Sequence, residues 1–279
     1  MQIHDMSDDR TAASGLQVLW MTWLISTLLL LGVGGTLFFA PGIAQGYWPW
    51  SLAPFNTRLL GAVYLSAAIP LISYLIRPRM DNLQLVLPIF TCFTTYFLLV
   101  SMGYRSSFLA RKSSSIWFFL YGADSAVGLF YCWRLRHYLL HSGGLVRFVK
   151  LYQFQAIFLS LSGLGLLLAP LLGMQFWMWP LDSFHSHLYS GVFLGGALGM
   201  GLLGAHSTHV GRIALGVTQA FLGVAIASGN WLVDQQVNKL AWNTIWPWFW
   251  QFAFLVFGAL GGYLAIQELR APKPLKPEP

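Results

Sequence analysis

The stretch YWPWSLAPFNTRL, residues 47–59, returns 129 positions later as FWMWPLDSFHSHL, residues 176–188. Each copy stands between two long apolar runs. When residues 34–68 are aligned without a gap to residues 163–197, 12 of the 35 positions are identical. Two unrelated hydrophobic segments share a few Leu and Gly residues, but not this many positions in one register. The sequence therefore predicts a duplicated unit.

The composition is that of a membrane protein. Hydrophobic residues make up 56% of the chain and charged residues 9%, and the mean hydropathy is +0.61, far from the balance of a soluble domain. A span needs about 20 apolar residues to cross roughly 30 Å of hydrocarbon. Eight segments meet this requirement: 16–40, 55–76, 83–103, 115–135, 154–172, 184–203, 213–231 and 244–266. The predicted fold class is an all-α membrane protein, with eight transmembrane helices in two parallel four-helix repeats.

The expected organisation follows from these spans. The repeats occupy residues 16–138 and 151–268, residues 139–150 form a cytoplasmic linker, and residues 1–15 and the Pro-rich residues 269–279 are disordered cytoplasmic tails. Four spans in each half make the repeats parallel, which predicts a pseudo-two-fold axis along the membrane normal. Of the 16 Lys and Arg residues, 11 fall on the side of the termini. This bias predicts a multi-pass protein of the cell inner membrane with both termini in the cytoplasm.

The expected partner is the lipid bilayer. The net charge of +7 follows from the topological bias and from snorkelling at anionic lipid, so no nucleic-acid partner is predicted. The second span of each half carries small residues four positions apart, which allow close approach of helices in lipid. They are Gly191, Gly195 and Gly199 in the second half, and Ala62 and Ser66 at the equivalent positions of the first. We expect these two spans to pack near the axis.

Tryptophan is concentrated near the expected outer boundary, including Trp48, Trp50, Trp177 and Trp179 in the two repeated turns. One interpretation is an aromatic belt at the headgroup level, and the other is a lid over a ligand in an outer vestibule. The turns, each followed by a small-residue helix, resemble those of uncharacterised bacterial multi-pass membrane proteins that carry W-P-W turns. This resemblance covers residues 34–68 and their repeat. It implies membrane localisation and brings no activity, cofactor or catalytic residue.

Asp124 is the only acid placed deep in an expected span. A carboxylate there costs at least about 2.5 to 3.5 kcal/mol on insertion scales, and by default it marks a functional interior. Because no Lys or Arg is expected at its depth, we expect the group to be protonated, solvated in a cavity or hydrogen-bonded. The candidate partners are Tyr64, Thr94, Thr95 and Gln219. A structural bond between helices and a proton-linked or ligand-contacting role both remain open.

Polar residues at the start of the second helix of each repeat form another candidate ligand site. Asn56 and Arg58 in the first copy correspond to His185 and His187 in the second. Helix N-termini bind anions, so these four side chains are candidates to bind a carboxylate or an anionic headgroup at the outer vestibule. The alternative for Arg58 is snorkelling to lipid phosphate.

Four histidines on the expected cytoplasmic side are candidate metal ligands by spacing alone. His137 and His141 are four residues apart, and His206 and His209 are three apart, which suits zinc. Their basic neighbours oppose a dication, so we predict that the four do not form one site, and no metal or other cofactor is expected. No P-loop, G-x-S-x-G or H-E-x-x-H motif and no pair of neighbouring acids predicts catalysis.

The predicted function is binding, or transport, of a small or lipidic ligand through an outward aromatic vestibule with a buried acid. The alternative is a membrane scaffold or assembly factor without a ligand, and the third interpretation is a metal-dependent membrane oxidoreductase. A cavity that reaches Asp124 favours ligand binding or transport. A filled core with an exposed lateral groove favours the scaffold, and convergence of the four histidines favours the oxidoreductase. No feature of the sequence predicts an oligomeric state.

Overall fold

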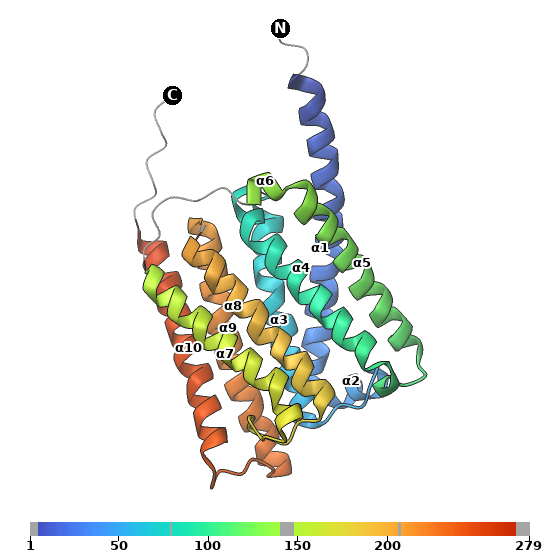
Figure 1. Cartoon of the computed structure of the whole chain (residues 1–279), viewed down its shortest axis with the longest axis vertical. Helices are drawn as coiled ribbons and strands as arrows, with labels where there is room; N and C mark the ends of the chain where they lie inside the picture. Colours follow the sequence, from blue (N-terminus) through green and yellow to red (C-terminus); the bar gives the residue numbers. More distant parts are fainter. Residues whose placement is uncertain (1–4, 79, 140–147, 206–207, 272–279) are drawn as a thin grey trace.

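The computed structural model describes residues 5–78, 80–139, 148–205 and 208–271. This part of the chain is almost entirely helical (Figure 1). The long helices are α1 (Asp5–Phe39), α3 (Pro54–Ile76), α4 (Met80–Gly103), α5 (Lys112–Arg134), α7 (Val149–Leu172), α8 (Ser183–Ala205), α9 (His209–Val237) and α10 (Ile245–Arg270). The short ones are α2 (Pro41–Tyr47), the 3₁₀ turn η1 (Arg105–Ser107) and α6 (Arg136–Leu139).

Seven helices within the described residues are long and apolar enough to cross a membrane, namely α1, α3, α4, α7, α8, α9 and α10. The chain is therefore an all-helical, multi-pass membrane protein, as its composition predicts. The remaining long helix, α5, has 23 residues but a lower hydropathy, because it carries Asp124 and several Ser and Tyr side chains. It runs alongside α4 in the bundle (Figure 1).

Corresponding helices of the two halves have corresponding packing partners. Within each half the first long helix packs on the second, α1 on α3 and α7 on α8, and the third packs on the fourth, α4 on α5 and α9 on α10. Between the halves, α3 packs on α9 and α8 on α4. Both bounds of α8 lie 129 positions after the corresponding bounds of α3, which is the offset of the repeated sequence.

The two ends of the bundle differ in what they carry. The start of α1 and the end of α10 lie at one end, which we call the terminal end, and the two repeated turns lie at the other, which we call the turn end (Figure 1). The connections from α4 to α5 and from α9 to α10 are also at the turn end. The largest hydrophobic cluster, which includes tryptophans of both turns, is built from residues of both halves.

Local sequence explains most helix boundaries. Pro41 and Pro54 stand in the first turn of α2 and α3, where a missing N–H costs nothing. Gly173 (φ 61°) and Asn238 (φ 46°) end α7 and α9 in the left-handed conformation that these residue types adopt most easily. Helix α1 begins at Asp5 rather than after the expected tail of residues 1–15, since acidic residues favour a helix N-terminus. Most of the linker and the C-terminal tail, residues 140–147 and 272–279, lies outside the described residues.

The small residues of the second helices face the other half. A methyl group added at Gly191 would overlap the ring of Tyr96 in α4, and one at Gly199 would lie 3.1 Å from Ile89 Cδ1 of the same helix. At Gly195 the nearest atom would be 3.8 Å away, an ordinary contact. Ala62 and Ser66 of α3 are buried, and α3 packs on α9. Each second helix thus has its main inter-half partner in the third helix of the other half.

Candidate functional site

The four tryptophans of the repeated turns lie inside the protein. Trp48, Trp50, Trp177 and Trp179 are between 1% and 6% exposed. Within each turn the two indoles meet edge to face, with centroids 5.2 Å apart in the first turn and 5.5 Å in the second. A belt at the headgroup level needs rings on the protein surface, so that interpretation does not hold for these four residues.

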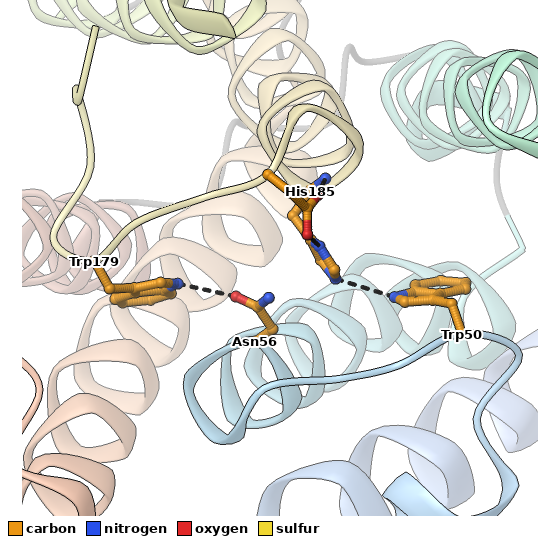
Figure 2. A network of polar contacts seen from close by, with 5 residues as sticks. Trp50, Asn56, Trp179 and His185 are labelled. Carbon is orange, nitrogen blue, oxygen red and sulfur yellow. Dashed lines mark hydrogen bonds and ion pairs between the residues drawn. The ribbon is translucent and has the colours of Figure 1, made fainter. Parts of the chain in front are cut away.

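Each turn sends one indole hydrogen bond across to the other half (Figure 2). Trp50 Nε1 donates to His185 Nε2 at 3.1 Å, and Trp179 Nε1 donates to Asn56 Oδ1 at 2.9 Å. The two donors are 129 positions apart, and so are the two acceptors. All four side chains are buried. We call this reciprocal pair the crossed tryptophan bonds.

The same two tryptophans, Trp50 and Trp179, each also pack on a phenylalanine of the other half. The centroid of the Trp50 ring lies 5.0 Å from that of Phe184, and the Trp179 ring is stacked on Phe55 with centroids 4.8 Å apart. Phe184 and Phe55 are also 129 positions apart. Aromatic pairs at such distances add about 0.5–1.5 kcal/mol each beyond their buried area, so the turn end holds the halves together through contacts of two kinds.

The partners of His185 define the hydrogen-bonding role of each ring nitrogen. Its Nε2 must carry no proton, because the Trp50 indole can only donate. Its Nδ1 lies 2.7 Å from Asp182 Oδ2, and its backbone N–H donates to Asp182 Oδ1 at 2.8 Å. In this arrangement His185 accepts from Trp50 at Nε2 and donates to Asp182 from Nδ1. Burial raises the pKa of the Asp182 carboxyl, but the hydrogen bonds and charge attraction from His185, together with the backbone N–H of Phe184, outweigh this and lower the pKa below its usual range.

Arg58 and His187 make equivalent contacts within their own halves. Arg58 Nη1 donates to the carbonyl of Phe38 at 3.1 Å, and His187 Nε2 donates to the carbonyl of Leu167 at the same distance. The accepting carbonyls are again 129 positions apart. The Nδ1 of His187 is 2.9 Å from the hydroxyl of Tyr104. Both groups thus tie the second helix of a half to its first helix, whereas the sequence suggested that they face a shared vestibule.

A cavity of about 350 Å³ lies in the first half and reaches Asp124. Its walls come from α1, α2, α3, α4 and α5, and the first repeated turn closes its end with Trp48. Three of its lining residues are strongly exposed apolar side chains: Ile43 is 63% exposed, Tyr47 77% and Ile116 56%. The cavity therefore reaches the surface of the protein at apolar residues of α2 and α5.

Asp124 is held by a partner that the sequence did not suggest. Ser26 Oγ of α1 lies 3.0 Å from Asp124 Oδ1 and 3.2 Å from Oδ2, and donates to this carboxyl. In the same cavity the hydroxyls of Tyr64 and Tyr121 are hydrogen-bonded to each other at 2.8 Å. Thr94, one of the predicted partners, lines the cavity too. Polar groups from four helices thus line the cavity that contains this carboxyl.

The other two predicted partners lie elsewhere. Thr95 is absent from the described lining of this cavity. Gln219 belongs to the second half, where its Nε2 donates to Gln155 Oε1 at 2.7 Å. Ser26 could not be recognised from sequence, because a serine within a long apolar run is common and its partner is 98 residues away.

A second cavity, of about 200 Å³, lies between the two halves and is lined by α7, α8, α9 and α10 of the second half and by α3 and α4 of the first. Several residues that line the second cavity lie 129 positions after residues that line the first. In the first cavity these positions hold Tyr64, Thr94, Tyr121 and Asp124, and in the second they hold Phe193, Gly223, Trp250 and Ala253. At these four positions the lining is polar in the first cavity and apolar in the second, whereas Phe90 of the first cavity corresponds to Gln219 of the second.

The terminal end holds a buried ion pair. Arg212 Nε lies 2.9 Å from Glu268 Oε2, and His209 Nδ1 lies 3.2 Å from the same oxygen. Glu268 is 3% exposed, and the sequence analysis missed it because an acid at the end of a span is normally solvated. His137 lies in α6, while His141 and His206 are outside the described residues. Within the described part of the chain no three His, Cys, Asp or Glu residues are placed to hold a metal ion.

No protein-family model, curated protein or solved structure matches this chain. The polar cavity at Asp124 and the crossed tryptophan bonds are therefore interpreted from their own geometry and chemistry.

Proposed function

We propose that this membrane protein binds a small or lipidic ligand in the cavity at Asp124. One observation carries the proposal: a cavity of about 350 Å³ contains a carboxyl within the bundle and also reaches exposed apolar side chains. Ligand sites are typically concave and mostly apolar, with a few convergent polar groups that fix orientation. Here those groups are Asp124, Ser26 and the Tyr64–Tyr121 pair.

The comparison of the two halves supports a ligand role for Asp124. If its carboxyl served only to join helices, the second half would need a similar group at the equivalent position. Ala253 stands there instead, and α7 and α10, the helices equivalent to α1 and α5, still meet through ring contacts such as Phe158 on Phe257, with centroids 4.7 Å apart. A carboxylate in a membrane is expensive, and a helix pair of this kind forms without one. The polarity of the first cavity is thus better explained by what it binds.

The apolar exposed walls suggest the route of entry. We infer that lipid covers the exposed apolar surface of Ile43, Tyr47 and Ile116, where the cavity reaches the surface of the protein. The crossed tryptophan bonds and the packed indoles cover the turn end. We therefore infer that the ligand enters laterally from the lipid, and not through an open outer vestibule. Transport would require a second state in which the turn end opens.

The topology that we propose has eight spans and two repeats, with both termini in the cytoplasm of a cell whose inner membrane holds the protein. Helix α5 is the eighth span, because it packs along α4 and three of its polar groups, Ser113, Tyr121 and Asp124, line the cavity. The common offset of 129 positions in the bounds of α3 and α8 and in the crossed bonds supports the duplication. The basic residues of the terminal end support its cytoplasmic orientation.

A cavity-filling pair of variants tests ligand binding. Gly32 lines the cavity, and a methyl group added there would meet no atom within 4 Å. Gly32→Phe should therefore fill the cavity without disturbing helix packing. Gly35 on the same helix has equally open space but does not line the cavity, so Gly35→Phe is the matched control.

The measurement is mass spectrometry of small molecules that co-purify with each protein in a mild non-ionic detergent. We expect one compound to be enriched with the wild type and with Gly35→Phe, and to be lost from Gly32→Phe at unchanged thermal stability. Identical lipid profiles for all three proteins would contradict the proposal and favour the scaffold.

A further inference from the structure

We propose that the cavity at Asp124 selects hydrophobic cations, such as amphipathic amines or quaternary ammonium compounds. This inference rests on the ligand-binding function proposed above and names the chemical class of the ligand. Three observations carry it: the charge balance of the lining, the aromatic rings around it, and the contrast with the second cavity.

The charge balance comes first. Asp124 is the only Asp, Glu, Lys, Arg or His among the described residues that line the cavity. Its hydrogen-bond donor, Ser26, is neutral, and the two tyrosine hydroxyls nearby are bonded to each other. In a low-dielectric interior a carboxylate needs a compensating positive charge. Within this cavity that charge is either a proton on the carboxyl or a cation supplied by the ligand, and an anion would be repelled by the ionised carboxylate.

Aromatic rings surround the same space. Trp48, Trp117, Tyr64 and Tyr121 all line the cavity. The ring centroids of Trp117 lie 5.7 Å from Trp48 and 4.2 Å from Tyr121, so the rings form one continuous wall. The face of an aromatic ring attracts a cation by about 0.5–2 kcal/mol, and such walls are used to recognise quaternary ammonium groups. Because Tyr121 precedes Asp124 by three residues on a helix, the wall and the carboxyl lie on one face of α5.

The second cavity has aromatic lining residues but no carboxyl at the position that corresponds to Asp124. At the position equivalent to Asp124 it has Ala253, and at those of Tyr64 and Tyr121 it has Phe193 and Trp250. Aromatic rings are therefore present in both cavities, but only the first joins them to an acid. An aromatic wall alone would suit any apolar ligand. The carboxyl next to it is what gives preference to a positive charge.

The test uses two probes of nearly the same shape and opposite charge, tetraphenylphosphonium and tetraphenylborate. Binding is measured by equilibrium dialysis of the purified full-length protein in a non-ionic detergent, with protein-free micelles as the blank. We expect tetraphenylphosphonium to bind at least about tenfold more tightly than tetraphenylborate, since a factor of ten corresponds to about 1.4 kcal/mol. Asp124→Asn should remove this preference, and Asp124→Glu, which keeps the charge, should retain it. Thermal unfolding of both variants verifies that they are folded.

The variants at Gly32 and Gly35 separate this proposal from the previous one. Gly32→Phe should abolish binding of the cation, and Gly35→Phe should leave it at the wild-type level. If both probes bind equally and both are lost in Gly32→Phe, the cavity is a ligand site but the preference for cations is wrong. Binding of the cation that is unchanged in Asp124→Asn, or absent from the wild type, also refutes the preference. The mass-spectrometric test of the proposed function does not depend on either probe.

Discussion

Removing one acceptor of the crossed tryptophan bonds should destabilise the folded protein. Asparagine, the residue type at the equivalent position of the other repeat, should restore part of the lost stability. In His185→Ala the buried Trp50 Nε1 loses the acceptor that lies 3.1 Å away. A buried donor left unpaired costs about 1–3 kcal/mol, so we expect the free energy of unfolding to fall by about that amount. At the equivalent position Asn56 accepts the bond of Trp179. His185→Asn should therefore cost less than half as much as His185→Ala.

The assay is unfolding by titration of a denaturing detergent into mixed micelles, followed by circular dichroism. A double-mutant cycle with Trp50→Phe isolates the bond from the loss of packing. Because His185→Ala leaves no orphan donor when Trp50 is already Phe, its cost should be about 0.5–1.5 kcal/mol smaller in that background. Two results would refute the reasoning: additive single variants, or an asparagine variant no more stable than the alanine one.

Three further predictions follow from the structure. Asp124→Leu should lower the free energy of unfolding by about 0.6 to 2 kcal/mol through the lost bond to α1, whereas Asp124→Asn should unfold like the wild type in the same titration. The pKa of Asp182 is lowered in the folded protein. The stability that this carboxylate contributes is therefore present above the unfolded pKa of about 3.9 and is lost as the pH falls through the lower folded pKa. Between pH 5 and pH 3 the wild type should lose more stability than Asp182→Asn, and equal losses would contradict this. Gly191→Ala should cost about 1–3 kcal/mol by overpacking against the Tyr ring of α4, and Gly195→Ala, which meets no close atom, should change stability by less than about 0.5 kcal/mol.

The sequence was most informative where the signal was periodic or repeated. The 129-residue offset was visible in the turn residues, and the bounds of α3 and α8 follow it. The apolar runs predicted the positions of the long helices, because the length needed to cross a membrane is fixed by its thickness. Their ends followed from local chemistry at residues such as Pro54 and Gly173.

The side-chain partners were not predictable in the same way. Asp124 was singled out because a buried acid is costly, but its bond to Ser26 depends on how α1 lies beside α5. The same holds for Trp50 and His185, whose pairing depends on the approach of the two halves. Composition at a helix end does not reveal whether a tryptophan turns outward to lipid or inward to protein. The inward orientation here follows from acceptors that lie 135 and 123 residues away.

The crossed tryptophan bonds have the form of an isologous contact, the kind found in two-fold symmetric homodimers, where residue i of one copy meets residue j of the other and the reverse. Such a contact closes on itself, and within this chain each donor finds its acceptor without a second molecule. If the chain were divided between α6 and α7, each piece would keep one indole donor and one acceptor with no partner at the turn end. Each piece would then be complementary both to the other piece and to a second copy of itself.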